Sequence, residues 1–478
     1  MDNAGKIEYK FLSLALIFGL LFVFLIPPLQ AADEDSHFKK SYLVSSLHLF
    51  AETNADGRVG NYIPQSIMDF ENNQRYIMGN MDAKYSYKNQ YIDTHVQVDK
   101  GESVFIEYST SKTNPILFIP QAIGMFLIKV TIDNPIFNLN DDISPINYLY
   151  AGRISNLFFY VLLCFFAIRT IPFMKNTLFL LCLMPMNFSL AASLSYDGII
   201  IGTLFLFISF IFKFAYDADI IKLNKSFLYS IIIFSIVIIQ LKQIYYPLMF
   251  LILLIPLTKY ENKKQRNIWF VYTLVAGVLS YAVWGAISKL FIQAGSTSTS
   301  SLATEQVKFI LGSPIEYLHI LLSSINNNLE FYFISFVGNL GWLDTNFPYV
   351  FTMLYFAMLI ISAIFDKSSN VSTIDYKHKL FILGVCLSVV VLIETALYVI
   401  WTSVVNGVGS PNITGVQGRY FIPISISMLI ILKNNYWKDK FKKINIHKFV
   451  DFIIPRVAVF SLILTLIILL LRYWIPGA

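Results

Sequence analysis

Three carboxylates and an imidazole follow the first long apolar run of the chain. The segment reads Asp33-Glu34-Asp35-Ser36-His37. A carboxylate at such a place can take the proton from an attacking hydroxyl group, and the imidazole beside it can bind substrate. The alternative is an acidic, solvated turn, because charged residues commonly flank a membrane span. Asp33 and Glu34 are therefore candidate catalytic residues and His37 a candidate binding residue.

Further candidates lie where later apolar runs begin or break. Asp197 follows Ser195 and Tyr196 and opens an apolar helix, where it could equally be a helix N-cap. Lys242 interrupts the apolar stretch 226–257, and its side chain could either snorkel to lipid phosphates or bind a phosphate group of a ligand. The candidate substrate-binding residues, besides His37 and Lys242, are Arg153, Tyr196, Asp197, Gln243, Tyr245, Tyr246, Trp342, Asp344, Gln417, Arg419 and Tyr420.

Some of these residues have simpler explanations. Arg419 opens an apolar run, where an arginine can anchor a helix at the membrane surface, and Trp342 could belong to an aromatic belt. Glu394 lies inside an apolar run, which is unusual, and we expect it to be a buried partner of Arg419 or Lys242.

Composition indicates that the bilayer is the solvent of this chain. Of its 478 residues, 56% are hydrophobic, 16% are aromatic and only 14% are charged, and the mean hydropathy is +0.61. A soluble domain of this size does not need so many apolar residues. The net charge of +6 falls mostly in short loops, which argues against nucleic acid as a partner. The three cysteines lack the spacing of a disulfide framework or a zinc site.

Apolar runs of about 20 residues predict an all-α polytopic membrane protein that forms one domain over residues 1–478. We take the first run as an uncleaved helix rather than a signal peptide, because it is long and lacks a small-x-small cleavage site. The predicted spans, about eleven, are 11–30, 147–168, 176–194, 198–215, 226–241, 244–257, 268–291, 348–365, 379–402, 419–432 and 453–474.

Three basic connections set the predicted orientation. They are the loops that contain Lys259–Arg266, Lys367–Lys379 and Lys433–Lys448. The positive-inside rule places all three in the cytoplasm, and alternation of the spans then places the N-terminus there too. Residues 31–146 and 292–347 become two large outer loops.

Both outer loops are expected to carry interfacial helices. The apolar piece 116–131 begins after Pro115 and contains Pro120, so we interpret it as an interfacial or re-entrant helix rather than a span. In the second loop a flexible Gly/Ser/Thr tract at 295–301 precedes amphipathic helices that reach about residue 337. No internal repeat or pair of broken helices, the signature of many transporters, is evident.

With this topology the candidate groups share one face of the membrane. Carboxylates that face cations at a membrane surface suit transfer of a group from a phosphate leaving group, because the carboxylate removes a proton and the cations neutralise the departing phosphate. Glycosyl transfer from a polyprenyl-phosphate sugar has these needs. A divalent metal would require carboxylates of two outer loops to converge.

Several stretches resemble a bacterial family of predicted membrane proteins whose members open with a Pro-Pro-Asp-Glu-Pro-x-His-Phe-like motif. This chain keeps the Asp-Glu and His-Phe pairs in the segment 31–38 but lacks the prolines, and Thr113–Phe118 replaces the Tyr-Pro-Pro-Leu-Tyr-Tyr of the family. The resemblance continues, in chain order, through Pro115–Ala122, Gly152–Asn156, Ala192–Asp197, Gly341–Asp344 and Gln417–Pro423.

The layout of this family is similar to that of GT-C glycosyltransferases, which implies a GT-C-like fold and an inverting reaction. By that resemblance Asp33 is the leading catalytic base, Glu34 its alternate, and Asp197 a second-site carboxylate that positions the acceptor or a metal. The expected enzyme acts at the outer face of a bacterial plasma membrane, among membrane lipids, and moves a sugar to a cell-envelope glycan or lipid-linked acceptor. The alternatives are a transporter, flippase or glycan polymerase/ligase, and a non-catalytic assembly protein.

Overall fold

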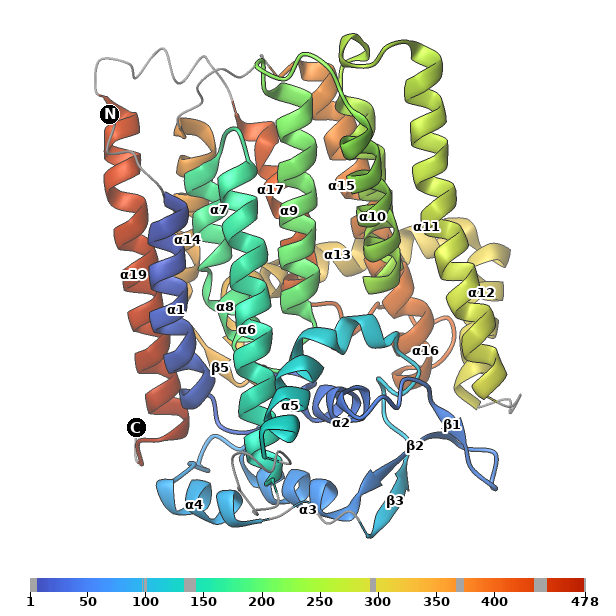
Figure 1. Cartoon of the computed structure of the whole chain (residues 1–478), viewed down its shortest axis with the longest axis vertical. Helices are drawn as coiled ribbons and strands as arrows, with labels where there is room; N and C mark the ends of the chain where they lie inside the picture. Colours follow the sequence, from blue (N-terminus) through green and yellow to red (C-terminus); the bar gives the residue numbers. More distant parts are fainter. Residues whose placement is uncertain are drawn as a thin grey trace.

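Long apolar helices dominate the computed structural model, which describes residues 7–96, 98, 101–132, 143–292, 298–366, 374–433 and 445–476 (Figure 1). Six helical segments in this part of the chain are long and apolar enough to cross a membrane. They are α1 (Ile7–Leu25), α6 (Pro145–Thr170), α9 (Asp197–Tyr216), α11 (Lys263–Phe291), α15 (Tyr376–Leu397) with its continuation η5 (Tyr398–Thr402) and α16 (Ser403–Val405), and α19 (Ile446–Tyr473).

Shorter apolar helices fill the rest of the bundle. They are α10 (Lys225–Leu241), η3 (Gln243–Leu254), α14 (Tyr349–Phe365), and the consecutive segments η6 (Gly418–Phe421), α17 (Ile422–Leu429) and η7 (Ile430–Leu432). The predicted break near Lys242 is confirmed, because α10 ends one residue before it and η3 begins one residue after it.

One predicted span has a different structure. Residues 176–194 form two short helices, α7 (Lys175–Cys182) and α8 (Pro185–Ala191). Pro185 starts the second helix, and because proline disfavours the helical conformation of the preceding residue, the chain is extended at Met184. The run is therefore buried in the bundle as a broken element, and the count of eleven spans stays a prediction.

The segment between α1 and α6 forms a layer at one end of the bundle, which we call the loop face (Figure 1). Its elements are α2 (Glu34–Ser45), β1 (Glu52–Thr53), β2 (Val59–Pro64), α3 (Gln65–Gln74), η1 (Arg75–Ile77), α4 (Tyr87–His95), β3 (Ser103–Ile106), η2 (Pro115–Phe118) and α5 (Ile119–Ile132). The strands pair antiparallel in the order β1-β2-β3, with Tyr62 opposite Phe105. The all-α prediction missed this small sheet.

Helix α2 is buried although most of its residues are polar, because its side chains find partners inside the layer. Lys39 pairs with Glu71 and with Asp35, and Lys40 donates hydrogen bonds to the carbonyl oxygens of Leu49 and Ser111. Burial lowers the pKa of Lys40 to about 8. These contacts join α2 to other parts of the loop layer.

The second predicted loop contains two helices and a short hairpin. Helix α12 (Ser298–Gly312) is followed by α13 (Pro314–Val337), which lies across the bundle rather than along it (Figure 1), and then by the paired strands β4 (Asn339–Leu340) and β5 (Thr345–Asn346). Gly341 turns the hairpin at φ +64°, a conformation that favours glycine. Part of the 295–301 tract, Lys367 and most of the last basic loop lie outside the described residues.

The first and last helices are neighbours, and the two ends of the chain lie at opposite ends of the bundle (Figure 1). Trp474 donates a hydrogen bond of 2.8 Å from Nε1 to the carbonyl oxygen of Leu25. Near the centre α6 packs against α9, which is largely enclosed by protein, whereas α11 at the edge exposes most of its side chains. The core thus surrounds α9, whose first residue is Asp197.

Candidate functional site

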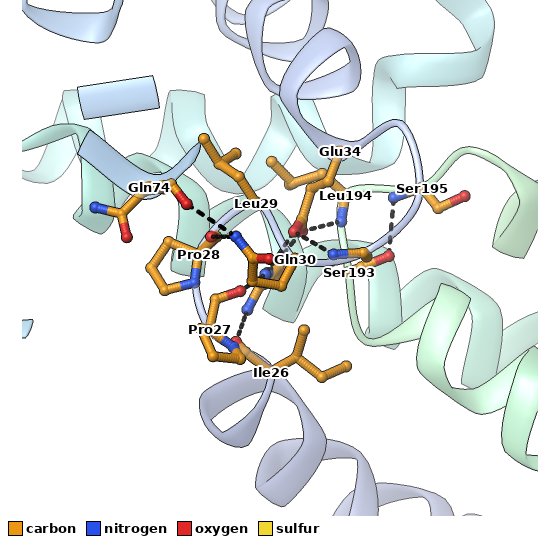
Figure 2. A network of polar contacts seen from close by, with 12 residues as sticks. Ile26, Pro27, Pro28, Leu29, Gln30, Glu34, Gln74, Ser193, Leu194 and Ser195 are labelled. Atoms are coloured by element: carbon orange, nitrogen blue, oxygen red, sulfur yellow. Dashed lines mark hydrogen bonds and ion pairs between the residues drawn. The ribbon is translucent and has the colours of Figure 1, made fainter. Parts of the chain in front are cut away.

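A fully buried ion pair ties the turn after α1 to the rest of the bundle. Glu34 accepts hydrogen bonds from Nε and Nη2 of Arg153 at 2.7 and 2.6 Å, and its Oε1 accepts a third from the backbone N–H of Leu194 at 2.9 Å (Figure 2). Arg153 also donates to the carbonyl oxygens of Ile26 and Pro27 at the end of α1. Both carboxylate oxygens of Glu34 are thus engaged, which suits a structural anchor better than a proton acceptor.

Asp33 lies one residue earlier but faces a different partner. It has φ 59°, a left-handed conformation that a residue other than glycine seldom adopts, and its side chain is 52% exposed. Its Oδ2 accepts a hydrogen bond of 2.8 Å from Nη2 of Arg419. The half-exposed carboxylate of Asp33 is accessible to a ligand, whereas the carboxylate of Glu34 is fully buried.

Arg419 joins carboxylates from two distant parts of the chain. Besides Asp33, its Nη1 lies 3.6 Å from Oδ2 of Asp197. Burial raises the pKa of Asp33, but the positive charges of Arg419 and Lys242 and the hydrogen bond from Arg419 oppose it and hold the pKa below its ordinary value. The carboxylate of Asp33 is therefore ionised at neutral pH. We call Asp33, Arg419 and Asp197 together the Asp33–Arg419–Asp197 cluster.

Close packing of η6 against α13 positions Arg419. The N–H of Gly418 donates to Oγ of Ser335 at 2.8 Å, and a Cβ at Gly418 would lie 2.0 Å from the carbonyl oxygen of Tyr332. Only glycine allows this approach. The guanidinium is 5% exposed, and its Nε has no hydrogen-bond partner in the described part of the chain.

Lys242 lies beside the cluster, in the turn between α10 and η3. Its Nζ is 4.8 Å from the ring centroid of Tyr420 and 5.8 Å from that of Tyr196, which places the ammonium group over two aromatic faces. Tyr245 supports this arrangement by donating a hydrogen bond of 2.8 Å to the carbonyl oxygen of Tyr420. None of the ion pairs found among the described residues involves Lys242, so its charge is available for an anion.

His37 is buried beside Tyr196, next to the cluster. Its ring is 2% exposed and lies 4.4 Å from that of Tyr196 and 5.8 Å from that of Phe118, measured between centroids. Burial lowers the pKa of His37 below its ordinary value, more than the neighbouring carboxylates raise it, so the ring is neutral at pH 7. Nδ1 has no hydrogen-bond partner within the described ranges.

A cavity of about 810 Å³ opens next to Lys242, between the first loop, the α10–η3 turn and the end of α11. Three lysines line it, Lys112, Lys242 and Lys289, together with Tyr196 and the exposed Gln243, and its described lining contains no carboxylate. A polar cavity of one sign of charge concentrates ligands of the opposite sign. The cavity therefore suits an anionic group.

Three other predicted site residues have structural contacts elsewhere, whereas Gln417 stays close to the cluster. Trp342 donates from Nε1 to the carbonyl oxygen of Leu29, and Asp344 pairs with Arg472 at 2.6 Å. Tyr246 shares a hydrogen bond with Ser235 and donates another to the carbonyl oxygen of Leu274. Gln417 lines a small crevice beside Arg419.

Glu394 does not pair with Arg419 or Lys242. Its Oε1 accepts a hydrogen bond of 2.9 Å from Tyr332, and it faces a separate apolar pocket. The expectation that it would compensate one of the two cations is therefore wrong. Sequence could not place it, because α15 and α13 meet only in the folded bundle.

Comparison with known families bears on the identity of the chain. The family model described as "predicted membrane protein (DUF2142)" matches residues 16–428. The chain belongs to this family. The matched region of this DUF2142 protein includes the whole Asp33–Arg419–Asp197 cluster and Lys242. No curated protein and no solved structure matches the chain.

The residues at the cluster do not fit a metal centre. Two carboxylates of this DUF2142 protein do converge, but on the guanidinium of Arg419. Among the described residues no three His, Cys, Asp or Glu side chains gather closely enough to hold an ion. The arginine instead supplies the positive charge between Asp33 and Asp197.

Sequence reasoning missed two cavity residues of this DUF2142 protein. Lys289 was counted within the predicted span 268–291, and Lys112 within a polar part of the first loop. The signal available was a lysine in the last turn of an apolar helix, which faces the same layer as Lys242.

Proposed function

We propose that this protein is a membrane glycosyltransferase of the GT-C kind that takes a sugar from a polyprenyl-phosphate donor. The observation that carries the proposal is the half-open carboxylate of Asp33, held by Arg419 beside a lysine-lined cavity. A base and a separate anion-binding cation side by side are what transfer from a phosphate leaving group requires.

In the proposed step, Asp33 accepts the proton of an acceptor hydroxyl while the oxygen of that hydroxyl attacks the anomeric carbon of the donor sugar. The new carbon–oxygen bond forms as the bond to the phosphate oxygen breaks, and the lipid phosphate leaves with the electron pair. Lys242, which has no carboxylate partner among the described residues, neutralises the leaving phosphate. Arg419 orients Asp33, and attack from the opposite side inverts the anomeric centre.

The basic connections predicted for the cytoplasm support a site at the outer face. Helix α11 begins with Lys263, Lys264 and Arg266, and it begins at the end of the bundle away from the loop face (Figure 1). The loop face, with Asp33 and Lys242, then faces outward. In a bacterial plasma membrane this is the side on which envelope glycans are exposed.

Reconstituted transfer tests the proposal. Wild-type protein in liposomes receives radiolabelled polyprenyl-phosphate sugars and envelope glycan or glycolipid acceptors, beside Asp33→Asn and the control Asp56→Asn, an exposed carboxylate of the same loop. Asparagine tolerates the left-handed conformation at residue 33. We expect Asp33→Asn to lower kcat by about 10²-fold or more and Asp56→Asn to leave it unchanged.

Lys242→Gln separates donor binding from proton transfer in the same assay. Loss of the free cation should raise KM for the donor while leaving KM for the acceptor near its wild-type value. Equal transfer by wild type and Asp33→Asn would refute the assigned base. If the wild-type protein transfers no sugar from any donor but moves the lipid across the bilayer, the protein is a flippase instead.

A further inference from the structure

An apolar groove beside η6 shares no lining residue with the lysine-lined cavity. It has a volume of about 380 Å³ and is bounded by α13, α14, α15 and the segment from Phe421 to Leu432. Several of its side chains are also exposed at the surface of the bundle, among them Leu329 at 47% and Ile360 at 41%. The groove is therefore open to the surrounding bilayer, and we call it the α13–α17 groove.

The groove begins beside the candidate site and runs away from it. Phe421, two residues after Arg419, lines the end of the groove at η6 and packs edge-on against Tyr332 with 5.3 Å between ring centroids. From Phe421 the lining follows α17 and η7 to Leu432, a length of roughly 17 Å at helical rise. Such a shape suits one extended hydrocarbon chain whose polar end lies near η6.

One polar group in the groove is incompletely paired. Glu394 is 0% exposed, and Oε1 accepts a hydrogen bond from Tyr332, but Oε2 has no partner in the described part of the chain. A buried carboxyl oxygen without a partner is costly unless a ligand supplies a hydrogen-bond donor. A hydroxyl group of a bound ligand would donate such a hydrogen bond to Oε2.

The charge of the lining distinguishes this groove from the lysine-lined cavity. Among its described lining residues there is no lysine or arginine, so nothing there would neutralise a phosphate. The lysine-lined cavity has three lysines and no carboxylate among its described lining. The two compartments are thus complementary to lipids of different head-group chemistry.

We infer that the α13–α17 groove binds a phosphate-free lipid that carries a hydroxyl group, and that this lipid is the acceptor. The hydrocarbon chain lies along α17, and a hydroxyl of the head group donates to Oε2 of Glu394. The role of this lipid as acceptor rests on the proposed function, whereas binding of the lipid in the groove does not require transfer. The anionic donor occupies the other compartment.

Photolabelling of the purified protein in lipid nanodiscs tests the inference without an activity assay. The probe is a diacylglycerol with a diazirine in one acyl chain, and the matched probe is the corresponding phosphatidic acid, which has a phosphate in place of the hydroxyl. We expect diacylglycerol to label peptides of α13, α14 or α15 at least about five-fold more than phosphatidic acid, the ratio that one hydrogen bond supplies.

Matched variants on the same helices locate the site. Ile360→Trp fills the groove, whereas Leu354→Trp places the same bulk on a part of α14 that is 61% exposed and outside the groove. The first should abolish groove labelling and the second should preserve it. Glu394→Leu should reduce labelling about five-fold, and Glu394→Gln, which keeps an acceptor oxygen, should stay within about two-fold.

Three results would overturn the inference: no labelling of the groove by diacylglycerol, equal labelling by phosphatidic acid, or labelling that Ile360→Trp leaves intact. A radiolabelled polyprenyl phosphate that labels the groove instead would assign it to the donor. Failure of the proposed glycosyl transfer would leave the labelling pattern unchanged, so the two hypotheses fail separately.

Discussion

Neighbouring carboxylates at positions 33 and 34 have different environments because the chain turns between them. Glu34 points into the bundle, where Arg153 neutralises it, and Asp33 points toward Arg419 with half of its side chain exposed. A buried charge pair of this kind contributes little if both members are replaced, but removal of one leaves an uncompensated charge.

The Glu34–Arg153 pair should therefore be far more sensitive to single than to double replacement. We expect Arg153→Met to lower the free energy of unfolding by about 3–5 kcal/mol, since it strands the Glu34 carboxylate and removes the donors to Ile26 and Pro27. Unfolding titrations in mixed detergent micelles measure the change. A Glu34→Met/Arg153→Met double variant that is as unstable as the single one would contradict the explanation.

His37 should give the protein a pH dependence at mildly acidic values. Its folded-state pKa is lowered, chiefly by burial, so the unfolded chain binds a proton more readily than the folded chain. Stability from this group is complete above the ordinary value of 6.5 and is lost as the pH falls below it. Thermal unfolding from pH 8 to pH 5 should show this loss in the wild type and a flatter profile in His37→Gln.

Asp33 contributes in the same sense as His37, but over a lower pH range. Its lowered pKa means that the folded state holds the carboxylate ionised, so its stabilising effect is present above pH 3.8 and disappears as the pH falls through the folded value. The carboxylate of Asp33, the proposed base, should therefore remain ionised across the range in which His37 titrates. A drop in transfer between pH 6.5 and pH 5 would then come from another group.

Residue types singled out the candidates, but the partner of each candidate could not be predicted. The structure brings Asp33, Asp197, Lys242 and Arg419 together, as expected from the acidic and basic residues at the ends of apolar runs. Nothing local distinguishes Asp33 from Glu34, because the arginine that selects between them lies 119 residues away from Glu34 in sequence.

At the scale of elements, the contact between η6 and α13 determines where the arginine of the cluster lies. A methyl group at Gly418 would meet the backbone of Tyr332 and Phe336, which cannot move aside as a flexible side chain could. We expect Gly418→Ala to lower stability by about 1–3 kcal/mol and to reduce transfer by displacing Arg419.

A glycine in a membrane helix provides the control for that substitution. Gly384 of α15 has nothing within 4 Å of its added Cβ, so Gly384→Ala should leave stability and transfer at or above the wild-type level. Thermal unfolding and transfer assays of the two variants, side by side, make the comparison. Equal behaviour of both would show that close packing at η6 is not required.

Elements with uninterrupted apolar runs were predicted from sequence, whereas elements shaped by packing were not. Helices α6 and α9 lie within two residues of the bounds that hydropathy predicts, and α19 ends within one residue but begins seven residues early. The break at Pro185 has a local cause that hydropathy does not register, and the crossing direction of α13 depends on neighbouring helices. The β1-β2-β3 sheet consists of strands of two to six residues with no clear period.

For the whole molecule, orientation in the membrane is the prediction with the widest consequence. Cysteine substitutions at Asp56 in the loop layer and at Asn262 before α11 should react differently with a membrane-impermeant maleimide in intact cells. The three native cysteines are buried and give little background. We expect labelling at position 56 and none at 262 until the cells are opened. The reverse pattern would place the site in the cytoplasm.

The contact between the first loop and the end of α19 bears on how the protein is made. The backbone of Tyr85 and the side chain of Lys84 in the first loop bond to the carbonyl oxygens of residues 471–473, and Arg472 reaches Asp344. Because Leu471 and Arg472 follow Lys84 by 387 and 388 positions in sequence, the loop that carries Asp33 must stay in the membrane without these supports until α19 has been synthesised. Synthesis of α19 is therefore the step that completes the supports of this loop.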